Sequence, residues 1–229
     1  MKKVGILISG RGSNMVALLK AMKKYNFSAT NTAADEAFPC EPRIVISNVL
    51  DAPGLEKARE YGVKTVVINH KESKTREEHD KKMIDALNEE EVDIVCLAGY
   101  MRLLSSMFVQ SFKNRILNIH PALLPSFPGL NVQKKAIDCG VRFSGCTVHI
   151  VDELCDHGPI LLQAVVPIFP NDTEETLSKR ILRYEHKTYP LALKLFAEDK
   201  FKIDGNRALL NVSREEYEAI IKTLMWDGD

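Results

Sequence analysis

The chain has 229 residues, and its 31 lysines and arginines balance its 31 aspartates and glutamates. A chain of this length can bury a substantial core without disulfides or a structural metal. The formal net charge of zero argues against a dedicated nucleic-acid-binding protein, because such proteins carry a basic surface. Strand-sized apolar runs, no signal peptide and no Cys-x-x-Cys pair predict a cytoplasmic protein with reduced thiols, no membrane span and no zinc site.

Short apolar runs alternate with amphipathic stretches through the first half of the chain. The predicted strands cover residues 4–8, 43–47, 64–68, 92–98 and 116–119, and the predicted helices cover residues 14–24, 53–61, 75–89 and 105–112. Strands that are apolar throughout are typical of a parallel sheet whose two faces are both covered. We therefore predict an α/β fold, Rossmann-like, with an open, mostly parallel sheet and helices on both faces.

After His120 the pattern changes to that of an antiparallel C-terminal extension. A helix over 133–139 precedes a predicted strand pair, 146–151 and 159–167. Asp172 with Glu175 indicates the start of a long helix that ends near residue 198. A hairpin over 201–203 and 208–211 follows, and Ser213 with Glu216 predicts the start of a last helix that ends near residue 225.

The first candidate site is the loop Ser9-Gly10-Arg11-Gly12-Ser13-Asn14, between the first strand and the first helix. Glycines leave backbone N–H groups open, and a helix N-terminus favours an anion. The loop lacks the third glycine of a dinucleotide fingerprint, because Met15 occupies that position, and it lacks the Walker A lysine. The pattern leaves two interpretations open, a monophosphate site and a tight turn capped by Ser13.

The second candidate site is Asn118 with His120, two residues apart at the end of a predicted strand and followed by three prolines. Residues i and i+2 of a strand face the same side, so these two side chains project together. An amide donor beside a titratable ring suits polarising a carbonyl and moving a proton. The alternative is a packed histidine, but sites of open α/β sheets lie at strand ends, which favours function. Gly99–Arg102 are expected to line the same crevice.

The third candidate site combines His149 with Asp156, in the loop between the two antiparallel strands. A carboxylate bonded to an imidazole holds its orientation and raises its pKa. For Asp152 and Glu153 we retain the interpretation of a solvated turn, and for Asp156 the residues alone leave both interpretations open. The other histidines in polar stretches are predicted to lie at the surface: His70, His79 and His157.

Together these sites resemble the phosphoribosylglycinamide formyltransferase family, which comprises folate-dependent enzymes of purine synthesis. The matching segments are 8–14, 97–104, 118–125, 145–149 and 156–163, and the likeness extends from about residue 3 to about residue 200. The His-Pro-x-Leu-Leu-Pro run that starts at His120 marks the wider formyltransferase superfamily, and the glycine loop narrows it to this family.

The resemblance implies transfer of a formyl group from the co-substrate 10-formyltetrahydrofolate to the amine of glycinamide ribonucleotide, without a metal. It implies that the catalytic residues are Asn118, His120 and Asp156. It assigns ribonucleotide contacts to Gly12, Ser13, Asn14 and Glu185. It assigns folate contacts to Arg76, Met101, Arg102, Leu103, Leu104, Val151 and Asp152. The partners it implies are these two small molecules, with no nucleic acid and no membrane, and it leaves monomer and homodimer open.

The resemblance also implies a domain organisation. Residues 1–200 are expected to form the formyltransferase domain, with a ribonucleotide-binding lobe over about 1–112 and a folate-binding, catalytic lobe over about 113–200. Residues 201–229 are expected to pack on the same domain. Two departures from the family are visible: the connection Ser28–Pro42 is longer than usual, and Asn131 stands where many members have histidine.

Three alternative functions remain to be compared with the transferase. A formyltetrahydrofolate hydrolase is similar in the catalytic region, but its family carries an extra N-terminal regulatory domain. A methionyl-tRNA formyltransferase carries a further RNA-binding domain, for which about 25 residues after the long helix are too few. A catalytically dead phosphate-binding module is disfavoured, because Asn118, His120 and Asp156 are all present.

Overall fold

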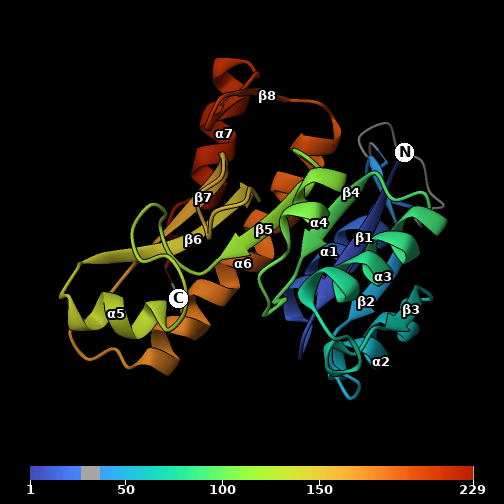
Figure 1. Cartoon of the computed structure of the whole chain (residues 1–229). Coiled ribbons are helices and arrows are strands. Elements are labelled where there is room, and N and C mark those ends of the chain that lie inside the picture. Colours follow the sequence, from blue (N-terminus) through green and yellow to red (C-terminus); the bar gives the residue numbers. More distant parts are fainter. Residues whose placement is uncertain (27–36, 229) are drawn as a thin grey trace. The chain divides into compact units, whose positions relative to one another are not determined.

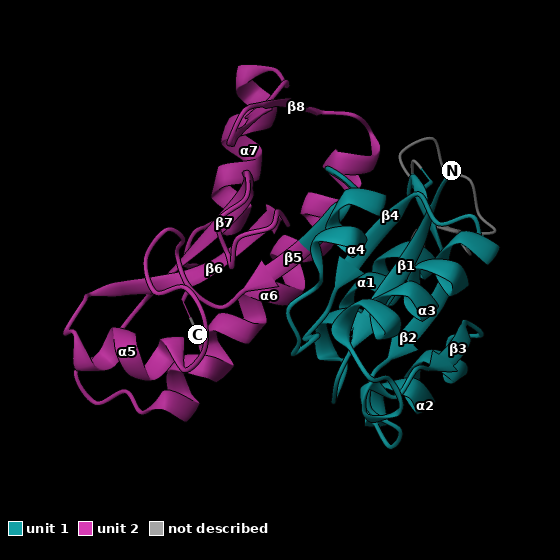
Figure 2. Ribbon diagram, in the orientation of Figure 1, with its two compact units in different colours: residues 1–117 teal, residues 118–229 magenta. Residues whose placement is uncertain are grey.

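The computed structural model describes residues 1–26 and 37–228. It divides into two compact units, residues 1–117 and residues 118–229 (Figure 2). A seven-stranded sheet has the strand order β3-β2-β1-β4-β5-β6-β7, and β8 pairs with β9 in a separate sheet (Figure 1). The predicted α/β fold is confirmed. Most of the connection predicted over Ser28–Pro42 lies outside the described residues.

Unit 1 alternates strands with helices. It contains β1 (Lys2–Ile8), α1 (Ser13–Asn26), β2 (Cys40–Ser47), α2 (Pro53–Glu60), β3 (Lys64–Val67), the 3-10 helix η1 (His70–Glu72), α3 (Arg76–Glu89), β4 (Ile94–Leu97) and α4 (Ser106–Ser111). β1 pairs in parallel with β2 and with β4, and β2 pairs in parallel with β3. Contacts join α1 to α2 and α3 to α4. This is expected when right-handed crossovers place successive pairs of helices on opposite faces.

The strand order of unit 1 reverses at β1, which lies between β2 and β4. Val4–Ile8 and all of β4 are buried, and every residue in these two segments except Gly5 has an apolar side chain. A sheet that is covered on both faces requires this pattern. In open α/β sheets, ligands bind outside the carboxyl ends of strands at such a reversal. Ser9 follows β1, and its N–H donates to the carbonyl of Gly99, near the end of β4, at 3.1 Å. The reversal therefore brings the glycine loop beside the segment that begins at Gly99.

Unit 2 contains the antiparallel part of the fold. β5 (Ile116–His120) crosses from one unit to the other, and α5 (Val132–Asp138), β6 (Phe143–Ile150), β7 (Ile160–Pro167), α6 (Glu174–Ala197), β8 (Phe201–Asp204), β9 (Arg207–Leu210) and α7 (Arg214–Leu224) follow. β6 pairs antiparallel with β7, and β8 with β9, as predicted. The long helix α6 packs on β6 and β7, and α7 packs on α6 and β7.

The start of α6 differs from its prediction by one residue. Its N-cap is Thr173, whose hydroxyl accepts the N–H of Thr176, and the Thr176 hydroxyl accepts the N–H of Thr173 in return. Asp172 instead pairs with Arg180, whose guanidinium donates to both carboxylate oxygens at 2.6 and 2.8 Å. Asp and Thr are both good caps, so sequence spacing cannot choose between two such neighbours.

The end of the chain folds back on α6. The guanidinium carbon of Arg180 lies 4.4 Å from the centre of the Phe169 ring and 5.8 Å from that of Trp226. The hydroxyl of Tyr184 donates to Asp227 at 2.6 Å. A stacked and hydrogen-bonded cluster thus anchors residues 226–227 to the first half of α6.

We expect the Asp172→Asn variant to lose roughly 2 kcal/mol of unfolding free energy near pH 7. The Arg180 guanidinium holds the pKa of Asp172 at about 2, below its ordinary value of 3.8. The side chain is only 4% exposed, so water screens this pair little. Because the folded carboxyl takes up its proton less readily than the unfolded one, the stabilisation is complete above about pH 4 and disappears as the pH falls towards about 2.

Urea unfolding at about pH 7 and about pH 2.5 measures this difference. Asp138→Asn is the matched control, because Asp138 pairs with Lys134 at 2.7 Å but is 59% exposed. We expect that control to change stability by less than about 0.5 kcal/mol. A loss in Asp172→Asn that is as large at the lower pH as at the higher one would contradict the role of its charge.

Candidate active site

The glycine loop Ser9–Asn14 joins β1 to α1. Gly12 has a φ of +67°, and its carbonyl accepts the N–H of Val16 at 2.9 Å, so α1 begins at Ser13. The first N–H groups of a helix have no partner within the helix, and the helix dipole favours an anion there. The predicted ribonucleotide contacts Gly12, Ser13 and Asn14 therefore lie where a phosphate group fits.

The shape of the glycine loop depends on α2. The N–H of Gly54 donates to the carbonyl of Gly10, and the ammonium of Lys57 donates to the carbonyl of Arg11, both at 3.0 Å. A Cβ atom on Gly54 would lie 2.7 Å from Ile8 Cδ1 and 2.9 Å from the Gly10 carbonyl oxygen. Gly54 was not among the predicted site residues, because the only sign of it in the sequence is the Pro53-Gly54 pair that opens a helix after the second strand.

Four polar side chains meet in unit 2: Asn118 and His120 on β5, His149 on β6, and Asp156 in the β6–β7 loop. His120 Nδ1 lies 3.4 Å from Asp156 Oδ2, and His149 Nε2 lies 3.8 Å from Asp156 Oδ1. Asn118 Nδ2 lies 3.1 Å from His149 Nε2. Both histidines are buried, and the Asp156 side chain is 13% exposed. The structure therefore brings together the three residues that the resemblance assigns to catalysis.

His149 orients the amide of Asn118. Its Nδ1–H donates to the carbonyl of Ile150 at 3.0 Å, which leaves a lone pair on Nε2. That lone pair accepts one N–H of Asn118. Burial lowers the pKa of His149 and so keeps the ring neutral, as this arrangement requires. The second N–H of Asn118 remains for another acceptor.

Replacing His149 by phenylalanine should lower kcat by about 5–10-fold, because Asn118 loses one orienting hydrogen bond of ordinary strength. Steady-state kinetics on the purified variant measures this effect. His149→Gln is the matched control, since its side-chain carbonyl offers an acceptor to Asn118 and should recover part of the rate. Full activity in His149→Phe would show that Asn118 needs no such support.

The proline-containing run after β5 supplies two backbone partners that sequence analysis missed. His120 Nε2–H donates to the carbonyl of Phe127 at 2.9 Å, which leaves Nδ1 as the nitrogen beside Asp156. The N–H of Gly129 donates to Asp156 Oδ2 at 2.8 Å. Phe127 and Gly129 have φ values of +53° and +83°. Prolines indicate a stiff run, but their spacing does not indicate which backbone groups turn inward.

Asp152 organises the loop between β6 and β7, residues 151–158. One of its carboxylate oxygens accepts the N–H of Leu154 at 2.9 Å, and the other lies 2.8 Å from His157 Nδ1. A Cβ atom on Gly158 would meet a backbone carbonyl oxygen at 2.0 Å, so only glycine fits there. The Asp152 carboxylate is thus bound to its own loop, while Val151 is half-buried at the start of the loop.

The predicted folate contacts in unit 1 lie on two segments. Met101 and Leu103 follow β4 and expose 70% and 59% of their surface, while Arg102 and Leu104 are half-buried. Arg76 is the first residue of α3 and is exposed. Large apolar side chains presented to solvent at a strand end suit an apolar ring system.

Glu185, the predicted ribose contact, lies on α6 and is only 7% exposed. The helix pattern left it open between solvent and a ligand. Because a buried carboxylate is costly without partners, its burial argues against a solvated surface charge.

The predicted surface position of His79 is wrong. His79 is fully buried on α3, and its Nε2–H donates to the carbonyl of Ile68 at 2.9 Å. The neighbouring Asp80 is also buried and accepts the N–H of Ser105 at 2.6 Å. Backbone partners satisfy the hydrogen-bonding groups of both side chains. Because their neighbours in the sequence are charged, the sequence pattern did not indicate that His79 and Asp80 are buried. His157 is exposed as predicted.

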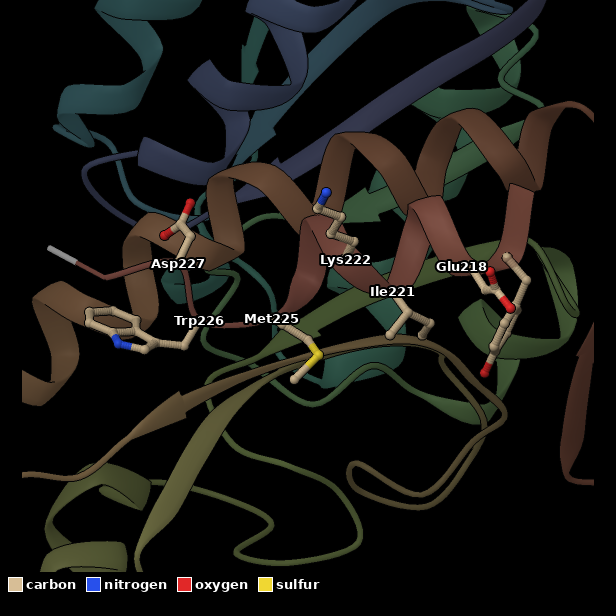
Figure 3. Close-up of a pocket in the computed structure, with 7 residues that line it drawn as sticks. Glu218, Ile221, Lys222, Met225, Trp226 and Asp227 are labelled. Atoms are coloured by element: carbon tan, nitrogen blue, oxygen red, sulfur yellow. The ribbon is translucent and has the colours of Figure 1, made fainter. Parts of the chain in front are cut away.

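A groove with a volume of about 580 Å³ lies along α7 and the residues that follow it. Its lining residues come later in the sequence than all of the predicted site residues. Figure 3 shows its lining side chains, which are Tyr217, Glu218, Ile221, Lys222, Met225, Trp226 and Asp227. None of the predicted substrate contacts or catalytic residues lines it.

Within residues 1–26 and 37–228, no helix is long and apolar enough to cross a membrane. No group of three or more histidine, cysteine, aspartate or glutamate side chains in this part of the chain could hold a metal ion.

The chain is similar to known formyltransferases. Residues 2–193 match the family model described as formyl transferase. Phosphoribosylglycinamide formyltransferase of Escherichia coli (strain K12) is 39% identical over 91% of this chain and 93% of its own length. The crystal structure of glycinamide ribonucleotide transformylase 1 from Symbiobacterium toebii is 43% identical with a TM-score of 0.85, covering 92% of this chain and 94% of that one.

Other relatives are much longer than this chain. The trifunctional purine biosynthetic protein adenosine-3 of Drosophila pseudoobscura pseudoobscura is 47% identical over 86% of this chain, which covers only 14% of that relative. The family match includes the glycine loop and all four residues of the cluster in unit 2. The chain therefore belongs to the formyl transferase family.

Proposed function

We propose that this chain transfers the formyl group of 10-formyltetrahydrofolate to the amine of glycinamide ribonucleotide. The products are formylglycinamide ribonucleotide and tetrahydrofolate, in de novo purine synthesis. The observation that carries the proposal is the contact of His120 with Asp156, 3.4 Å apart and beside Asn118, in a member of the formyl transferase family.

The first step is attack of the neutral amine on the formyl carbon. The new C–N bond pushes an electron pair onto the formyl oxygen, which becomes an oxyanion. The second N–H of Asn118 and the Nδ1–H of His120 donate to this oxygen. Donors that are already oriented when charge develops lower the barrier more than donors that must first reorganise.

The second step moves one proton and releases folate. The attacking nitrogen loses a proton, which passes to Asp156, directly or through a water. Asp156 returns this proton to the folate nitrogen as its bond to the formyl carbon breaks and the oxyanion collapses to a carbonyl. His120 Nε2 faces the Phe127 carbonyl and Nδ1 faces Asp156 Oδ2, so the ring is held in place through both steps.

Substrate binding is divided among the predicted contacts. The N–H groups at Gly12, Ser13 and Asn14 take the ribonucleotide phosphate, and Glu185 accepts from the ribose. The folate contacts are those named above: Arg76, Met101, Arg102, Leu103, Leu104, Val151 and Asp152. The cytoplasmic location and the independence from metal stay predictions from the sequence.

The deciding experiment is an assay for formyl transfer from 10-formyltetrahydrofolate to glycinamide ribonucleotide, with water as the competing acceptor. We expect formylglycinamide ribonucleotide as the product and little free formate. Formate released at the same rate with and without the ribonucleotide would identify a hydrolase instead.

A further inference from the structure

The hydroxyl of Ser9 joins three strand ends in unit 1. Ser9 follows β1, and its hydroxyl donates to Asn48 Oδ1, just after β2, at 2.6 Å. The same oxygen accepts the N–H of Met101, just after β4, at 2.8 Å. Together with the bond from the Ser9 N–H to the Gly99 carbonyl, this gives the segment after β4 two anchors on a single residue.

The direction of these hydrogen bonds limits what Ser9 can do. A hydroxyl has one proton, and the Ser9 proton goes to Asn48. Asn48 is only 3% exposed, and its backbone carbonyl accepts the Nδ1–H of His70 at 2.9 Å, so the residue that carries the Oδ1 acceptor is held in place by its burial and its backbone. Ser9 therefore has no proton left to donate to a phosphate, although it lies on the glycine loop.

The rest of the glycine loop is held by different contacts. Gly10 and Arg11 are anchored to α2 through Gly54 and Lys57, and neither anchor uses the Ser9 hydroxyl. Met101, in contrast, presents an exposed apolar side chain, and the Ser9 hydroxyl holds its backbone. The two substrate segments of unit 1 therefore have separate supports.

We propose that Ser9, oriented by Asn48, is a positioning residue for the folate co-substrate, and that Gly54 has the matching role for the ribonucleotide. This inference rests on the proposed function for the identity of the two ligands. Ser9 lies on the glycine loop, which is proposed to bind the ribonucleotide, yet Ser9 is expected to affect binding of the folate co-substrate.

The test compares Ser9→Ala with Gly54→Ala. Loss of one hydrogen bond to the segment after β4 should raise KM for 10-formyltetrahydrofolate about 5–30-fold in Ser9→Ala, with KM for the ribonucleotide within about 2-fold of wild type. Gly54→Ala pushes on Gly10 and should show the reverse pattern. Ser9→Thr keeps the hydroxyl and should restore the folate KM.

Calorimetric titration with each substrate separately makes the test independent of turnover. A wild-type chain that binds both substrates but transfers no formyl group contradicts the proposed function alone. Equal losses of both affinities in Ser9→Ala, or an unchanged folate affinity, overturn the role of Ser9. Asn48→Ala removes the acceptor of the Ser9 proton, so it provides a second variant should Ser9→Ala fail to fold, and its folate affinity should fall in the same way.

Discussion

The His120→Ala variant should transfer formyl groups about 10²–10⁴-fold more slowly than the wild-type chain at saturating substrates. His120 supplies the Nδ1–H donor for the oxyanion, while its Nε2–H is committed to the Phe127 carbonyl. Alanine removes the donor, and it also leaves the Asp156 carboxylate without the imidazole 3.4 Å away. Steady-state kinetics with both substrates varied would separate the loss in kcat from any change in KM.

Ribonucleotide affinity provides the internal control for His120→Ala. The proposed phosphate contacts lie on the glycine loop of unit 1, whereas His120 belongs to unit 2. Affinity for glycinamide ribonucleotide should therefore stay within about 3-fold of wild type, a difference below 1 kcal/mol. Equal kcat values in the variant and the wild type would remove the basis of the proposed mechanism.

The second large effect is expected in Asp156→Asn, where kcat should fall by about 10²–10³-fold. An asparagine side-chain oxygen can still accept the N–H of Gly129, so the loop should keep its shape. What disappears is the charge beside His120 and the group that takes up and returns the proton. Single-turnover kinetics should show the loss in the chemical step itself.

Asp152→Asn is the matched control for this variant. Asp152 lies in the same loop and accepts the N–H of Leu154, which asparagine can also do. We expect its kcat to fall by less than about 10-fold, because the residue has no proposed part in the chemical step. If both variants lose activity to the same extent, loop order rather than proton transfer explains the effect of Asp156.

The sequence carries enough information to predict the fold and half of the polar cluster in unit 2. Buried apolar strands such as β1 and β4 have a pattern that few other elements share, so their order along the chain predicts the sheet. Asn118 and His120 lie on one strand, where a two-residue spacing implies a common face. In the structure both side chains do reach the cluster around Asp156.

Contacts between distant segments are not encoded in local spacing. Asp156 reaches His120 because the loop between β6 and β7 has a positive φ of +52° at Asp156 itself, and the presence of an aspartate does not predict that conformation. Only the family resemblance indicated that Asp156 acts together with His120. The burial of His79, which bonds to the carbonyl of Ile68, depends on a particular contact that pattern rules do not include. The same holds for the choice of Thr173 over Asp172 as a cap, since Asp172 pairs with Arg180.

Trp226 is the single tryptophan of the sequence, and its position decides what intrinsic fluorescence can report. Its ring lies 5.9 Å from that of Tyr184 and 6.4 Å from that of Phe169, next to Arg180. Emission from this indole will therefore follow the release of the C-terminal segment from α6. It should be a sensitive spectroscopic probe for the Asp172 variants, whereas titrations of substrate into the glycine loop will need an added fluorophore or calorimetry.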